Sequence, residues 1–207
     1  MPSLSPQEIA AFLVAVSFAA GLNVYATAGA LGLMGRLGVL ALPGDLGVLS
    51  SWWIIGICAA LWAVEFIVDK IPAIDVLWNA AQAFVRVPIA SLLAYAGATD
   101  LGPGWQLAAA AAGAALAAAA TSGKTATHAS VAASPEPFTN VAISLAEDAF
   151  VIFIVWFATE HPFIAAAIVL VMLAAVILAV RAIVRVLRRW RARHRAIGSS
   201  AIGSSSV

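Results

Sequence analysis

The sequence predicts an all-α protein that crosses a membrane several times. Hydrophobic residues make up 63% of its 207 residues and charged residues only 10%, whereas soluble domains have about 45–50% and about 25%. The apolar residues also form long continuous stretches rather than the short alternating segments of a transmembrane barrel. So much apolar surface requires contact with lipid. We therefore expect a polytopic transmembrane helical bundle.

Six apolar segments approach or exceed the length of a spanning helix. The breaks between them carry proline and glycine, which end helices. The third segment contains polar residues and Pro88, so it is either one span or a surface helix joined to a short span. The fourth either ends at Ala120 or continues as a broken helix. The segments are residues 9–33, 51–68, 74–96, 105–120, 138–158 and 163–180.

The basic residues predict how the chain is threaded. Six of the eleven Lys and Arg residues lie within residues 185–195, and cytoplasmic segments carry such an excess. We expect both termini in the cytoplasm at a bacterial inner membrane, with Arg181 to Arg195 against anionic lipid headgroups. The same threading places the Lys70 turn and a loop at residues 124–137 in the cytoplasm.

The six segments predict one transmembrane domain over residues 1–197, followed by a disordered Ser/Gly-rich tail at 198–207. Its halves are residues 9–98 and 105–195. Because each half has three spans, the second half must enter the membrane in the opposite orientation, as in transporter repeats. A short echo between residues 23–27 and 123–127 agrees with this. We expect a 3+3 inverted repeat with broken or re-entrant helices.

Polar residues recur at helical spacing within three of the apolar segments. An ionisable side chain inside a span costs about 2.5–3.5 kcal/mol on insertion scales, so it usually faces a polar interior. Asp148 lies near the middle of the fifth segment. The second of the three stripes either lines the same interior or faces water as an interfacial helix. The stripes are Glu136, Asn140, Ser144 and Glu147; Asp75, Asn79, Gln82 and Arg86; and Glu65, Asp69 and Lys70.

Two further places carry polar groups. Gly21 and Asn23 either unwind the first segment and free carbonyls for an ion, or simply pack against other helices. Residues 123–125 read Gly-Lys-Thr but lack the first glycine of a phosphate-binding loop, so no nucleotide site follows.

Lys124 and His128 either pair with the acidic stripe or lie in a solvated loop. The metal question stays open: the three histidines are far apart and Cys58 is the single thiol, but carboxylates can hold a hard cation.

Three motifs resemble a known family of small membrane proteins. They are Gly-Leu-Asn-Val-Tyr at 21–25, Glu-Phe-Ile-Val-Asp-Lys-Ile-Pro at 65–72 with Asp75, and Ser-Pro-Glu-Pro-Phe at 134–138 through Glu147-Asp148. The chain resembles the domain-of-unknown-function 4126 family over about residues 11–192. The resemblance implies no activity. It implies that family motif positions are occupied by Glu65, Asp69, Lys70, Asp75, Glu136, Asn140, Glu147 and Asp148.

These features predict a small membrane transporter or channel-like carrier, coupled to protons or cations, with a carboxylate-lined site between the halves. The alternative is a non-transporting membrane protein that binds a lipid headgroup or a partner protein. Six short helices barely enclose a cavity, so we expect a homo-oligomer. No catalytic signature indicates an enzyme, and we expect no cofactor and no nucleic acid. The candidate residues for binding a small solute or ion are Glu147, Asp148, Glu65, Asp69, Asn140, Glu136, Lys70, Asp75, Asn23, Lys124 and His128.

Overall fold

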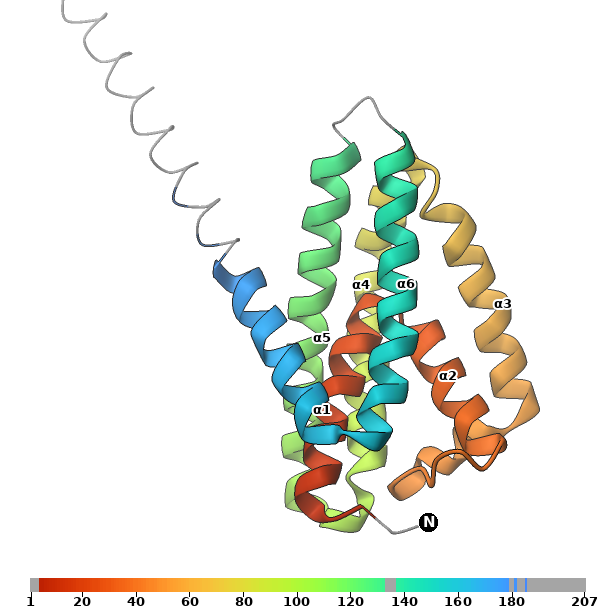
Figure 1. The fold of residues 1–207 in the computed structure, drawn as a ribbon, viewed down its shortest axis with the longest axis vertical. Helices are drawn as coiled ribbons and strands as arrows, with labels where there is room; N and C mark the ends of the chain where they lie inside the picture. Colours follow the sequence, from red (N-terminus) through yellow and green to blue (C-terminus); the bar gives the residue numbers. More distant parts are fainter. Residues whose placement is uncertain (1–3, 133–136, 179–180, 182–184, 186–207) are drawn as a thin grey trace, which may run out of the picture.

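The computed structural model describes residues 4–132, 137–178, 181 and 185, and the regular elements within them are all helices (Figure 1). The all-α prediction is therefore confirmed. Two short 3-10 helices, η1 (Gly44–Ser50) and η2 (Thr99–Leu101), connect longer ones. The α-helices are α1 (Pro6–Leu22), α2 (Val24–Arg36), α3 (Trp52–Val68), α4 (Pro72–Gly97), α5 (Pro103–Ala132), α6 (Pro137–Glu160) and a last helix, Pro162–Leu178.

Several of these helices are long and apolar enough to cross a membrane. Three qualify alone, and η1 with α3, bent by 74°, makes a fourth if the two count as one span. α1 and the last helix are apolar but shorter. By length and composition the described residues thus contain three or four spans rather than the predicted six. The three are Leu77–Gly97, Pro103–His128 and Val141–Glu160.

The first apolar segment is not one spanning helix, because the chain doubles back at Asn23. Asn23 has an extended backbone (φ −148°, ψ 102°), and its side-chain oxygen accepts a hydrogen bond from the backbone N–H of Ala26 at 2.9 Å. It therefore caps α2 in a new direction instead of continuing α1. We call α1 and α2 the re-entrant pair. The interruption foreseen as one alternative at Gly21 and Asn23 is present.

Both outer ends of the re-entrant pair lie at the same end of the bundle (Figure 1). The first turn of α1 lies beside Trp105 in α5. Beyond α2, a Cβ on Gly44 of η1 would lie 2.3 Å from the carbonyl oxygen of Ala96 in α4. We call this the Gly97 end. The 26 residues of α4 rise about 39 Å at 1.5 Å per residue, so the Lys70 turn lies at the opposite end. The start of α1 and the Lys70 turn therefore lie at opposite ends of the bundle, because the first segment turns back, whereas the sequence predicted both in the cytoplasm.

Small residues let the helices approach closely around α1. A Cβ on Gly21 would lie 2.6 Å from the Cα of Ala117, and one on Gly113 would lie 2.7 Å from the Cβ of Ala94. The alanine-rich part of α5 therefore packs directly against α1 and α4. α4 runs unbroken through Pro88, so it is one helix rather than a surface helix and a short span.

Candidate functional site

A cluster of charged side chains is buried where α3, α4, α5 and α6 meet. α5 continues to Ala132, so residues 121–128 are helical and the predicted loop at 124–137, in its described part, is wrong. The buried charged side chains come from all four helices, and we call them the charged cluster. They are Glu65 and Asp69 (α3 and its C-cap), Arg86 (α4), Lys124 and His128 (α5) and Glu147 (α6).

Arg86 and Glu65 form the most deeply buried pair of the charged cluster. The Arg86 Nη2 atom lies 2.5 Å from Glu65 Oε1, and both side chains are 0% exposed. Lys124 connects this pair to the other acids. Its Nζ lies 3.2 Å from Glu65 Oε1, 3.0 Å from Asp69 Oδ2 and 3.5 Å from Glu147 Oε2. One ammonium group is therefore shared among three carboxylates from two other helices.

Glu147 has the most exposed side chain of the charged cluster. Its side chain is 17% exposed, while those of its partners Lys124 and His128 are almost completely buried. His128 Nε2 lies 3.1 Å from Glu147 Oε2, the same oxygen that faces Lys124. The two basic groups thus converge on one carboxylate oxygen.

The tip of the re-entrant pair meets α6 beside the charged cluster. Asn23 Nδ2 donates to Asp148 Oδ1 at 3.0 Å, next to Glu147 in the chain. The Thr121 hydroxyl donates to the carbonyl oxygen of Gly21 at 2.7 Å, so α5 stabilises the end of α1 where the helix stops. The N-terminus of α2, which carries partial positive charge, begins at the residue after Asn23. The tip is therefore held by hydrogen bonds to two spanning helices.

The site contains more acid than permanent base. Among the described side chains there are four carboxylates against two permanent cations and a third at the edge of the site: Glu65, Asp69, Glu147 and Asp148 against Arg86, Lys124 and Lys70. Neutrality inside the bundle therefore requires bound protons, a protonated His128 or an added cation. Among the described residues, no group of three or more His, Cys, Asp or Glu side chains is placed to hold a metal ion.

Lys70 lies at the edge of this site, in the turn after α3. Its Nζ donates to the carbonyl oxygen of Phe66 at 2.7 Å and lies over the Phe66 ring. Burial lowers the pKa of the Lys70 amine, and the carboxylates of Asp148 and Asp69 oppose that change. Lys70 therefore adds positive charge near the acids without joining the ion pairs that surround Lys124.

Sequence reasoning identified most of this site. The structure brings together the predicted Glu65, Asp69, Lys124, His128 and Glu147, and it joins Asn23 to Asp148. Asp75 and Asn140 belong to α4 and α6, but their side chains lie outside the described part of the chain, and Glu136 lies outside the described residues altogether. The interfacial alternative for the second stripe is wrong for its described side chains, which are buried: Asn79, Gln82 and Arg86.

Three contributors were missed as site residues. Arg86 was recognised only as part of a stripe, although a charge in mid-segment is the signal that selected Glu147. Gln82, which accepts a hydrogen bond from Tyr25 (3.3 Å between Tyr25 Oη and Gln82 Oε1), was likewise recognised only as part of that stripe. Thr121 carries no sequence signal, because hydroxyl groups are common in membrane helices.

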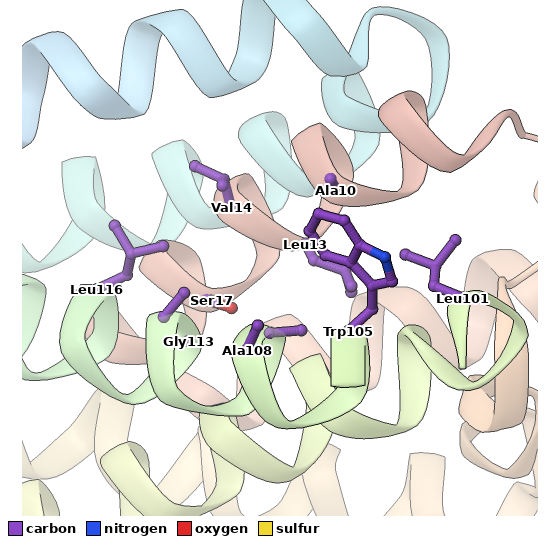
Figure 2. A pocket seen from close by; sticks show the side chains of 11 residues that line it. Ala10, Leu13, Val14, Ser17, Leu101, Trp105, Ala108, Gly113 and Leu116 are labelled. Carbon is purple, nitrogen blue, oxygen red and sulfur yellow. The ribbon is translucent and has the colours of Figure 1, made fainter. Parts of the chain in front are cut away.

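An apolar pocket of about 210 Å³ lies away from the charged cluster, between α1 and α5 (Figure 2). The Trp105 ring, Leu13 and Leu116 line it, and Ser17 supplies its only side-chain hydroxyl. It has no ionisable side chain, so it offers none of the chemistry of the charged cluster.

The long apolar helices and the buried charges define an α-helical membrane protein. The family model described as "Domain of unknown function (DUF4126)" matches residues 10–182. The chain therefore belongs to this family, and the resemblance found in its motifs is confirmed. No curated protein and no solved structure matches the chain. The description of this family names no activity.

Proposed function

We propose that this protein is a small membrane carrier coupled to the movement of protons or another cation. The observation that carries the proposal is the charged cluster with Asp148, in which four carboxylates face two permanent cations inside an apolar bundle. Buried ion pairs add little net stability, since desolvation offsets their attraction. Their cost inside a membrane is a reason to expect a functional role.

The re-entrant pair supports the same proposal. Carriers bind solutes and coupling ions near the bilayer midplane, at helices that are interrupted there. Here the interruption at Asn23 contacts Asp148, one residue from Glu147. The site therefore joins a helix break to titratable groups, the two features that such carriers combine.

Glu147 is the proposed proton-exchange residue. Its Oε2 atom faces both Lys124 and His128, so a proton at that oxygen removes the charge that attracts both. Lys124 would then keep its ion pairs with Glu65 and Asp69. The ion pairs that connect α5 to Glu147 of α6 would be lost. Protonation thus changes which helices are held together, which a coupled carrier requires.

The proposed membrane arrangement accounts for the six apolar segments as five crossing helices and one re-entrant pair. α3 and α6 run in opposite directions, as do α4 and the last helix (Figure 1), which a 3+3 inverted repeat requires of its second and third helices. The positive-inside rule favours a cytoplasmic Lys70 end, with the start of α1 on the other side. A bacterial inner membrane and a homo-oligomer remain part of the proposal.

Proton flux in proteoliposomes tests the proposal. The wild type, under an imposed pH or sodium gradient, is expected to move protons, and Glu147→Gln is expected to abolish this. Glu160→Gln is the matched control, because it removes an exposed carboxylate at the other end of α6. Equal flux in wild type and Glu147→Gln would contradict the assigned site. Absence of flux in every gradient would favour the alternative, a protein that binds a lipid headgroup or partner.

A further inference from the structure

A second apolar pocket, of about 290 Å³, lies between α2, α3 and α6. We call it the α2–α3 pocket. None of its described lining residues carries a charge, and the hydroxyl of Tyr25 is already engaged in a hydrogen bond to Gln82. Four of the lining residues are exposed, so the pocket opens to the surroundings of the helices. They are Leu33 and Leu37 (α2 and its C-cap), Ala59 (α3) and Ile152 (α6).

The α2–α3 pocket has the length and the lining that suit a hydrocarbon chain. Along α2 it reaches from Tyr25 to Leu37, a rise of about 18 Å at 1.5 Å per residue. α2 ends and α3 begins at the Gly97 end of the bundle (Figure 1), so Leu37 lies at the outer end of the pocket and Tyr25 at its inner end. In a membrane, an apolar opening of this kind faces acyl chains rather than water.

A basic side chain and an aromatic side chain meet at the outer end of the pocket. Arg36 lies one helical turn after Leu33, which lines the pocket from α2. Trp52 lies one turn before Ile55, which lines it from α3. Both are exposed, and the Arg36 guanidinium lies 5.2 Å from the centroid of the Trp52 ring. Among the described residues Arg36 has no carboxylate partner, so its charge is available to a ligand.

An apolar pocket with a cationic rim matches the two parts of a phospholipid. Tryptophan is enriched at the depth of lipid headgroups, and a guanidinium forms charge-assisted hydrogen bonds with phosphate oxygens. A zwitterionic headgroup carries its own cation, so Arg36 favours an anionic one. We propose that the α2–α3 pocket binds an anionic phospholipid, with an acyl chain in the pocket and the phosphate at Arg36. This inference is independent of the carrier proposal, because no member of the charged cluster lines the pocket.

Native mass spectrometry of the purified full chain in detergent measures the dissociation constant of the first bound lipid. The wild type is expected to bind phosphatidylglycerol about fivefold more tightly than phosphatidylcholine with the same acyl chains, the effect of one basic residue on an anionic lipid. Arg36→Gln is expected to remove this preference, and Arg36→Lys is expected to keep it. Arg185→Gln, which removes an exposed arginine away from the pocket, is the matched control and should keep it as well.

A filled pocket provides the second arm of the test. Ala59→Phe places a large ring in the pocket and is expected to weaken the binding of both lipids at least about tenfold, because the acyl chain loses its apolar contacts. Ala111→Phe, the same change at an exposed position of α5, should leave both dissociation constants unchanged. Size-exclusion chromatography checks that each variant is folded.

Alkylation of Cys58 by N-ethylmaleimide locates the lipid, since Cys58 lines the pocket and is the single cysteine of the chain. Phosphatidylglycerol is expected to slow the alkylation in the wild type at a lower concentration than phosphatidylcholine. Equal binding of the two lipids by the wild type, or a preference that survives Arg36→Gln, overturns the proposal. Binding that leaves the alkylation rate unchanged also overturns it. Equal protection by glycerol phosphate would identify a soluble phosphate compound instead of a lipid.

Discussion

The buried Arg86–Glu65 pair yields a sharp prediction, because only one of its members can lose its charge. An arginine stays protonated in proteins, whereas a glutamate can take up a proton. Arg86→Met leaves Glu65 facing Lys124 and Asp69. The electrostatic cost of this substitution cannot exceed the free energy of protonating Glu65, because a neutral Glu65 needs no positive partner. Glu65→Leu removes the carboxylate partner of the Arg86 guanidinium, which cannot lose its charge.

The limit follows from the ordinary pKa of glutamate, near 4.3, and about 1.36 kcal/mol per pH unit. Protonating Glu65 costs about 4.4 kcal/mol at pH 7.5 and about 1.6 kcal/mol at pH 5.5. The stability that Arg86→Met loses relative to wild type should therefore shrink by up to about 2.7 kcal/mol between these pH values. The sign is fixed: the variant must bind a proton to fold, so its stability falls as pH rises. Glu65→Leu should lose about 3–5 kcal/mol at both pH values.

Unfolding by SDS in mixed micelles, followed at pH 7.5 and 5.5, measures these differences. Arg36→Gln is the matched control, since it removes an exposed arginine and should change the free energy of unfolding by less than about 1 kcal/mol. If the loss in Arg86→Met is equal at the two pH values, or larger at pH 5.5, the charge reasoning is wrong.

Two further predictions concern the re-entrant pair, and thermal unfolding measures both. Asn23→Ala removes the cap of α2 and the hydrogen bond to Asp148, and should cost at least about 1 kcal/mol; an unchanged melting temperature would contradict the role of Asn23. Gly21→Ala places a Cβ 2.6 Å from the Cα of Ala117 and should cost about 1–3 kcal/mol. Gly56→Ala meets no atom within 4 Å and should leave stability unchanged or raise it by up to about 1 kcal/mol.

The sequence predicted the helical class and most of the charged site because both depend on local chemistry. Glu147 and Asp148 are costly wherever apolar helices bury them, so their positions alone indicate a polar interior, whereas the sequence left Lys124 open between that interior and a solvated loop. Helical spacing also placed Arg86 on the face that the structure shows buried. Hydropathy and helical periodicity therefore predict the helices and much of the polar site of a membrane protein.

The path of the first segment could not be predicted from the sequence. An apolar stretch of 25 residues satisfies the length of a span, and hydropathy does not distinguish a helix that crosses from two that return. The difference is made by the hydrogen bonds of Asn23 and Thr121 with groups about 100 or more residues away. The same long-range contacts hold the start of α1 at the end of the bundle opposite the Lys70 turn. The sequence left open whether the fourth segment ends at Ala120 or continues, because the burial of the polar residues at 121–128 depends on other helices.

The re-entrant pair also has a consequence for how the protein is made. The pair is synthesised before its partners, since Asp148, which contacts its tip, follows Asn23 by 125 residues. At about 5–20 residues per second this interval is roughly 6–25 s. During that time two short apolar helices with a polar tip have neither α5 nor α6 to lie against. The tip of the re-entrant pair therefore reaches its final contacts only after α5 and α6 have been synthesised.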